Sequence, residues 1–296
     1  MPSNLPGAAF CRQSALCVQP PDKNAPIGVF DSGLGGLTAV RELRRLLPAE
    51  DIVYFGDTGR VPYGTRGVDI IIQYAKQDIA FLLDQHVKYI MAACGTVSST
   101  LPRTDSNALP VPYLGVVQSA AAAAVAATRS GRIGVIGTPA TVKSGSYNDS
   151  IRALLPTAHT TATGCPLFVP LVENGYFGNN NQVTRLVAQD YLRDMKQADV
   201  DTLILGCTHY PLIADIIADI MGPHVTLIDP GAEAAKTAKH ALDSAGLLRD
   251  TAQRQDGTAR YYVSDSIESF ARLSGWFLGS YAGGSITQIS VDGYCV

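Results

Sequence analysis

The sequence predicts an α/β protein made of two similar domains, each a mainly parallel sheet flanked by helices. Short apolar runs alternate with amphipathic helical segments, a pattern typical of parallel strands joined by right-handed crossovers. The run Ile133-Gly134-Val135 repeats Ile27-Gly28-Val29, and each copy leads, after 74 and 67 residues respectively, to a strand end with a cysteine and a threonine. A chain of 296 residues is long enough for two domains. We expect internal pseudo-symmetry and an active site in the cleft between the domains.

The domain boundaries follow from this repeat. We expect a first α/β domain at residues 27–117 plus 229–296, because the elements after 229 are too few for a third domain, and a second domain at 118–228. Residues 1–26 are rich in Pro, Ser, Asn and Gln without periodicity, which predicts a flexible N-terminal tail.

The individual elements are predicted from apolar spacing and from glycine or proline punctuation. Leu37, Val40, Leu43 and Leu47 share one helical face, for example. The predicted strands are 27–30, 51–55, a run ending at Cys94, a run within 132–140, a run ending at 170–175, the apolar run 202–204 before Cys207, and 261–265. The predicted helices are 37–47, 68–85, 119–128, 185–197, 232–245 and 267–273.

Composition and charge exclude several classes of protein. A net charge of −3 and a pI of 5.9 argue against nonspecific nucleic-acid binding. The longest apolar run, Ala120–Ala127, is too short for a membrane helix, and the proline-interrupted N-terminus does not resemble a secretory signal. We therefore expect a cytoplasmic protein.

The six cysteines form neither a C-x-x-C pair nor a cluster with zinc spacing, so no metal site is expected. Most buried cysteines act as small hydrophobic residues, and we assign that role to Cys11, Cys17, Cys165 and Cys295.

Two cysteines stand apart, in Ala92-Ala93-Cys94-Gly95-Thr96 and Leu205-Gly206-Cys207-Thr208-His209. Each follows a strand in a repeated half and precedes a threonine, and His209 can exchange protons with a neighbouring thiol. Ligands of parallel sheets bind at the carboxyl ends of the strands, where Asp31, Asp57 and Cys94 also fall. We therefore hypothesise that the two thiols face each other across one substrate.

Opposed thiols suit the inversion of a stereocentre. One thiolate removes the α-proton of an amino acid from one face while the other thiol protonates the opposite face, and reversal exchanges their roles. A disulfide oxidoreductase would place its cysteines close in sequence, and a cysteine hydrolase would need one. The glycine turn Gly33-Leu34-Gly35-Gly36 lacks the dinucleotide and phosphate-loop patterns.

Several linked motifs occur in order along the chain: Ile27-Gly28-Val29-Phe30-Asp31-Ser32-Gly33 with Gly35-Gly36-Leu37-Thr38, Tyr54-Phe55-Gly56-Asp57-Thr58, Arg60-Val61-Pro62-Tyr63-Gly64-Thr65, Ala93-Cys94-Gly95-Thr96 and Gly206-Cys207-Thr208-His209-Tyr210-Pro211-Leu212. Together they closely resemble the motifs of the glutamate racemases of the aspartate/glutamate racemase superfamily. The resemblance covers about residues 27 to 275. It implies a cofactor-independent two-base racemase with two α/β domains that supplies D-glutamate for peptidoglycan.

The resemblance also implies roles for individual residues. Cys94 is the base toward D-glutamate, assisted by Asp31, and Cys207 is the base toward L-glutamate, assisted by His209. Asp57 and Glu173 match further acidic positions near the site. Asp31 and His209 would also belong to the substrate-binding set, and hydroxyl or backbone donors to the substrate carboxylates would come from Ser32, Tyr63, Gly64, Gly95, Thr96 and Thr208. Simpler roles for Asp31 and Asp57 are turn or helix caps.

One position departs from the family pattern, which has asparagine where this chain has Gly95. Glycine lacks the side-chain amide, so it offers the substrate only a backbone N–H. The loss of one hydrogen bond to a charged group costs about 1.5 to 3 kcal/mol unless another group replaces it.

Other functions stay open. The chain could racemise aspartate or another amino acid, or be a noncatalytic two-lobed amino-acid-binding protein. A related decarboxylase would retain a single thiol. Lys143 is the nearest candidate for a Schiff-base lysine of a pyridoxal phosphate enzyme. A homodimer, and a cell-wall precursor that acts through the N-terminal arm, are further expectations without a motif to support them.

Overall fold

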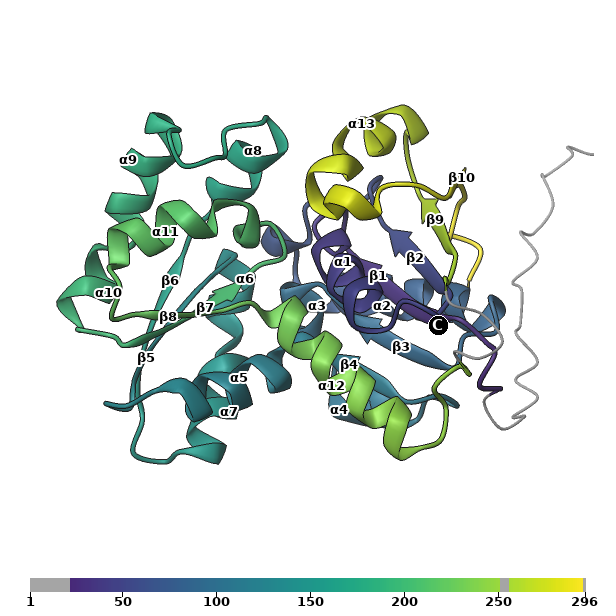
Figure 1. Ribbon diagram of the computed structural model, residues 1–296, viewed down its shortest axis with the longest axis horizontal. Coiled ribbons are helices and arrows are strands. Elements are labelled where there is room, and N and C mark those ends of the chain that lie inside the picture. The colour runs from purple at the N-terminus through teal and green to yellow at the C-terminus, as the bar shows by residue number, and fades with distance from the viewer. Residues whose placement is uncertain (1–21, 251–255, 295–296) are drawn as a thin grey trace, which may run out of the picture.

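The computed structural model describes residues 22–250 and 256–294, and it contains two sheets flanked by helices (Figure 1). The first sheet has the strand order β10-β9-β2-β1-β3-β4, and the second has the order β6-β5-β7-β8. Neighbouring strands in both sheets run parallel. The expected α/β class with two similar parts is therefore confirmed.

The strands of the first sheet are β1 (Ile27–Asp31), β2 (Ile52–Gly56), β3 (Tyr89–Ala92), β4 (Tyr113–Gly115), β9 (Ala259–Val263) and β10 (Ser285–Gln288). Those of the second sheet are β5 (Arg132–Gly137), β6 (His159–Gly164), β7 (Thr202–Gly206) and β8 (Thr226–Ile228). The order β2-β1-β3-β4 returns as β6-β5-β7-β8. The sequence repeat is thus a repeat of topology, which makes β3 equivalent to β7.

The helices that accompany the first sheet are α1 (Leu37–Leu46), η1 (Tyr63–Thr65), α2 (Val68–Asp84), α3 (Gly95–Thr100), α4 (Arg103–Asn107), α12 (Pro230–Ser244), α13 (Ile267–Leu278) and η3 (Gly279–Tyr281). The other helices are α5 (Val116–Ala127), α6 (Pro139–Ser144), α7 (Ser146–Leu154), α8 (Phe168–Glu173), α9 (Gln182–Tyr191), α10 (Arg193–Gln197), η2 (Tyr210–Ile213) and α11 (Ala214–Met221).

The central strands are apolar because helices cover both faces of each sheet. Ile27, Val29 and Phe30 of β1 are fully buried, as expected for a parallel strand inside an α/β layer structure. Helix α1 buries Leu37 and Leu43 on its sheet-facing side. This packing brings the carboxyl ends of the strands in both sheets toward the junction of the two lobes (Figure 1).

The chain after β8 returns to the first sheet, where β9 pairs with β2 and β10 pairs with β9. Helix α12 contacts both α1 and α5, so it joins the two parts. We propose residues 27–117 with 229–296 as one domain and 118–228 as the other.

Two predicted elements were wrong. Residues 170–175 do not end a strand, because α8 spans Phe168–Glu173 and Gly175 closes it with a φ of 81°. A short apolar run cannot by itself distinguish a strand from a buried helix. The single helix expected at 185–197 is two helices, α9 and α10, that meet at Leu192.

The predicted N-terminal tail lies mostly outside the described residues, which begin at 22. Its last residues contact the fold at Lys88, a fully buried lysine just before β3. The Lys88 Nζ donates to the carbonyl of Lys23 at 2.6 Å and lies 2.5 Å from the Glu50 carboxylate. This cluster lies at the amino end of β3, opposite the end that leads to Cys94.

Candidate active site

A cavity of about 320 Å³ lies between the carboxyl ends of the two sheets. Residues from both halves line it, including Cys94 and Cys207, which follow the equivalent strands β3 and β7. A larger, open depression beside β9 is lined by Arg44, Arg260 and residues 280–285, and the described residues that line it include no thiol, imidazole or carboxylate. The smaller cavity, which holds two thiols and the His209 imidazole, is therefore the candidate active site.

Cys94 is the cavity thiol of the first half. It directly precedes α3, is only 4% exposed, and its Sγ lies 3.5 Å from the Ser32 Oγ. Burial, together with the nearby charge of Asp31, raises the pKa of the Cys94 thiol to about 12, although the Ser32 hydrogen bond opposes the rise. Cys94 therefore stays protonated near neutral pH and needs a proton acceptor in order to act as a base.

Asp31, the last residue of β1, is that neighbouring carboxylate. Its Oδ2 accepts hydrogen bonds from the backbone N–H groups of Gly33 and Gly36 at 3.2 and 3.1 Å, so the predicted turn-capping contact exists. Its Oδ1 is buried and has no hydrogen-bond partner among the described residues. Burial raises the pKa of Asp31, although the charge of His209 and the backbone bonds oppose the rise. One oxygen is thus available to hold a proton.

Cys207 belongs to a chain of polar groups in the second half. Its Sγ lies 3.9 Å from the His209 Nδ1, and the His209 Nε2 lies 2.9 Å from the Glu173 Oε1. Burial alone would lower the pKa of His209, but the contacts with Cys207 and Glu173 outweigh it and raise this pKa to about 10. His209 is therefore protonated at neutral pH, and its Nδ1 lies next to the Cys207 sulfur.

Threonine hydroxyls line the contact between the halves. The Thr96 Oγ1 lies 3.1 Å from the Thr138 Oγ1 and 3.5 Å from the Thr141 Oγ1. Thr208 also lines the cavity, and its Oγ1 lies 3.4 Å from the His209 Nδ1. Ser32, Gly64, Gly95, Thr96, Thr208 and His209, all predicted binding residues, are among the residues that line this cavity.

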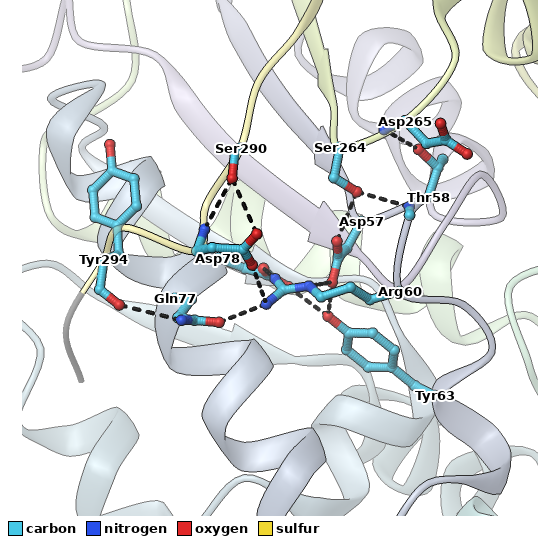
Figure 2. Close-up of polar contacts among 12 residues, drawn as sticks. Asp57, Thr58, Arg60, Tyr63, Gln77, Asp78, Ser264, Asp265, Ser290 and Tyr294 are labelled. Carbon is cyan, nitrogen blue, oxygen red and sulfur yellow. Dashed lines mark hydrogen bonds and ion pairs between the residues drawn. The ribbon is translucent and has the colours of Figure 1, made fainter. Parts of the chain in front are cut away.

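Three predicted site residues differ from the rest, and the first of them, Asp31, does not line the cavity although it was predicted to bind the substrate. Tyr63 lines the cavity, but its hydroxyl donates a hydrogen bond to Asp57, away from the cavity. Asp57 is fully buried, does not line the cavity, and pairs with Arg60 (Figure 2). The Tyr63 hydroxyl is thus already engaged, which leaves its backbone and ring to face a substrate. Glu173, the other predicted acid, does line the cavity.

Gly95 lies where the two halves come closest. A Cβ atom at this position would lie 2.5 Å from the carbonyl oxygen of Gly206, which is shorter than a real contact. Gly64 is similarly close to the second half, because its Cβ would lie 2.9 Å from the Thr138 Cβ. The departure from the family asparagine therefore coincides with a backbone contact that leaves no room for a side chain.

The sequence reasoning missed Thr138 and Cys165, which also line the cavity. Thr138 follows β5 as Ser32 and its neighbours follow β1, and Cys165 follows β6 as Asp57 follows β2. Full use of the repeat could have identified Thr138. Strand β6, with the sequence His-Thr-Thr-Ala-Thr-Gly, has no apolar run, so the position of Cys165 at a strand end was not visible.

Within residues 22–250 and 256–294, no group of three or more His, Cys, Asp or Glu side chains has the arrangement of a metal site. In the same part of the chain, no helix has the length and apolar character needed to cross a bilayer.

A two-part α/β fold with a thiol from each half at one cavity has the groups needed to invert a stereocentre, which is the chemistry of a racemase. The family model for Asp/Glu/Hydantoin racemases matches residues 34–238. The chain therefore belongs to this family, and it is an amino-acid racemase.

Individual relatives narrow the comparison. The chain is 41% identical over 266 residues to a glutamate racemase of Geobacter metallireducens, covering 90% of this chain and 97% of that protein. It is 44% identical to the enzyme of Streptococcus gordonii, covering 86% and 96%. Among solved structures, a glutamate racemase isoform of Bacillus anthracis superposes with a TM-score of 0.85 at 33% identity, covering 90% and 98%. The glutamate racemase of Francisella tularensis in complex with D-glutamate gives 0.84 at 37%, covering 92% and 100%.

Proposed function

We propose that this chain interconverts L-glutamate and D-glutamate by a two-base mechanism that needs no cofactor. The observation that carries the proposal is the presence of Cys94 and Cys207, from equivalent strands of the two halves, in one cavity. Glutamate is the proposed substrate because the relatives are glutamate racemases and the Francisella tularensis structure is a complex with D-glutamate.

Each thiol has its own neighbouring acid–base group, Asp31 for Cys94 and His209 for Cys207. Cys94, with its high pKa, passes its proton toward Asp31 before it deprotonates D-glutamate. Cys207 deprotonates L-glutamate, and the protonated His209, whose Nδ1 lies 3.9 Å from the Cys207 Sγ, is its neighbour. In each direction the opposite thiol returns a proton to the other face of the α-carbon, so the carbanion receives one proton for the one that it lost.

The substrate carboxylates need donors on both sides of the cavity. The proposed donors are the hydroxyls of Ser32, Thr96 and Thr208 and the backbone N–H groups near Gly64 and Gly95. Thr138 adds a hydroxyl from the second half, 3.1 Å from that of Thr96. These donors would compensate for the hydrogen bond that the family asparagine makes and that Gly95 cannot make.

The proposed cellular role is the supply of D-glutamate for peptidoglycan in the cytoplasm, which rests on the resemblance to the family. A homodimer and control by a cell-wall precursor are parts of the same expectation.

The test incubates purified protein, without added cofactor, with L-glutamate, D-glutamate or L-aspartate in deuterium oxide. Optical rotation follows inversion, and NMR follows deuterium at the α-carbon. We expect inversion and exchange with both glutamate enantiomers, and loss of inversion in Cys94→Ala and in Cys207→Ala. Cys165→Ala, which removes a third cavity thiol, is the matched control and should still exchange both enantiomers.

The outcomes separate the alternatives. Inversion of aspartate alone would identify a different substrate. Full inversion in both Cys94→Ala and Cys207→Ala would refute the two-thiol mechanism.

A further inference from the structure

Behind one wall of the cavity lies a buried polar network that the proton transfers do not use. The Arg60 guanidinium lies between two carboxylates, with Nε 2.6 Å from the Asp57 Oδ2 and Nη2 2.9 Å from the Asp78 Oδ1. Its Nη1 donates to the Gln77 Oε1 at 2.5 Å. Figure 2 shows the guanidinium at the centre, with the Tyr63 hydroxyl directed at the same carboxylates.

Arg60 supplies the positive charge that balances the two buried carboxyl groups of this network. Asp57 and Asp78 are both fully buried, and within the described residues Arg60 is the only cationic side chain with an ion pair to either of them. Burial and repulsion by Asp57 raise the pKa of Asp78, whereas Arg60 lowers it. Without the guanidinium, two buried carboxyl groups would face each other across the Tyr63 hydroxyl, a costly arrangement.

The network reaches the cavity through one short segment. Residues 61–65, which follow Arg60 directly, line the cavity, whereas Arg60 itself does not. The Tyr63 hydroxyl ties this segment to Asp57 on one side. On the other side, Gly64 abuts Thr138 of the second half. Residues 61–65 are therefore held in place by the buried network on one side and by the second half of the protein on the other.

We propose that Arg60 is a positioning residue of the racemase site, which holds residues 61–65 against the substrate by drawing together Asp57, Asp78 and the Tyr63 hydroxyl. This inference rests on the proposed function, because the wall matters only if the cavity binds the substrate. Arg60 acts through Tyr63 and makes no contact with the substrate.

The test measures glutamate racemisation in both directions for Arg60→Gln, Arg60→Lys and Tyr63→Phe. A displaced binding wall should raise KM about tenfold in Arg60→Gln and change kcat less than about threefold. Arg60→Lys should recover only part of this loss, because lysine keeps the charge but cannot bridge two carboxylates with a planar fork. In a double-mutant cycle, Arg60→Gln and Tyr63→Phe should be non-additive, since both act on one network.

Two control variants distinguish positioning from general destabilisation. Asp292→Asn removes a carboxylate that is 81% exposed and lies 3.9 Å from the same guanidinium, and it should leave KM unchanged. Lys88→Met breaks a buried ion pair at the amino end of the sheet, so it should lower stability without raising KM while the protein is folded. If Arg60→Gln does not fold, Tyr63→Phe, which keeps the cavity-facing ring, should still raise KM.

An unchanged KM in Tyr63→Phe and the Arg60 variants, or additive effects in the cycle, would overturn the positioning role while glutamate racemisation stands. An inactive wild-type chain would instead refute the proposed function, and with it the role of Arg60.

Discussion

Gly95 of the first half and Gly206 of the second half meet so closely that a Cβ atom on Gly95 would lie 2.5 Å from the Gly206 carbonyl oxygen. Both residues line the cavity that holds the two thiols. The contact therefore sets the distance between the two halves, and with it the distance between the Cys94 and Cys207 thiols.

Gly95→Ala is expected to lower kcat/KM for glutamate by about tenfold to a hundredfold, because the lobes must move apart and misplace the thiols. The overpacked contact should also cost about 1 to 3 kcal/mol of unfolding free energy. Steady-state kinetics and denaturant unfolding measure the two effects. Gly67→Ala is the matched control, since a Cβ there has no neighbour within 4 Å. A Gly95→Ala protein as active as Gly67→Ala would show that the lobes tolerate the extra carbon.

Gly95→Asn, which restores the family residue, should also lose activity. The asparagine side chain meets the same Gly206 oxygen before its amide can reach a substrate. A gain in kcat/KM would mean that the missing amide, not the close contact, limits this enzyme. The variant is measured beside Gly95→Ala in the same assay.

Asp31→Asn should slow the deprotonation of D-glutamate more than that of L-glutamate. The substitution removes the carboxylate proposed to accept the Cys94 proton. It also removes a charge that raises the pKa of Cys94, but burial is the larger cause, so this pKa should stay above its ordinary value. Initial rates of α-proton exchange from each enantiomer in deuterium oxide measure the asymmetry. Equal losses in both directions would indicate that Asp31 serves the turn at Gly33 and Gly36 and not one thiol.

Glu173→Gln should lower the pKa of His209 from about 10 and move the alkaline limit of L-glutamate deprotonation to lower pH. Glutamine keeps a hydrogen-bond acceptor but loses the charge that favours the imidazolium. The imidazole resonances, titrated by NMR, report the pKa directly. Asp219→Asn, which breaks an exposed ion pair with Arg185, should leave the pH profile in place.

The raised pKa of His209 also makes the unfolding free energy depend on pH. A group whose pKa is higher in the folded state stabilises the fold fully below its ordinary pKa of 6.5, and this contribution disappears as pH rises through about 10. Glu173→Gln should therefore destabilise the protein more at pH 6 than at pH 11. Urea unfolding at the two pH values checks the sign, and a larger effect at pH 11 would contradict it.

Lys88→Met should lower the unfolding free energy by about 3 to 5 kcal/mol, because it leaves the buried Glu50 carboxylate without its cation. Lys236→Met, which breaks the surface pair with Glu233, should cost less than about 1 kcal/mol. Denaturant midpoints of the two variants provide the comparison. A cost for Lys88→Met as small as that for Lys236→Met would show that Glu50 finds another partner.

The fold class, the repeat and the two cavity thiols could be predicted from the amino-acid sequence. Alternating apolar runs and amphipathic segments reflect the local periodicities of strands and helices, and parallel topology places residues such as Asp31, Cys94 and Cys207 at one end of their sheets. Where periodicity was ambiguous, as at α8, or absent, as at β6, local reasoning failed because packing against other elements decides such segments.

The partners of each site residue, by contrast, depend on how the elements pack together. The side-chain direction of Tyr63 and the space around Gly95 depend on Asp78 and Gly206, which other elements bring into contact. Hydrogen bonds and close contacts act over about 3 Å, a distance that spacing along the chain cannot predict between residues far apart in sequence. The two thiols could therefore be predicted from the strands that they follow. The lack of room at Gly95 results from the Gly206 carbonyl of the other half, a contact that the sequence does not reveal.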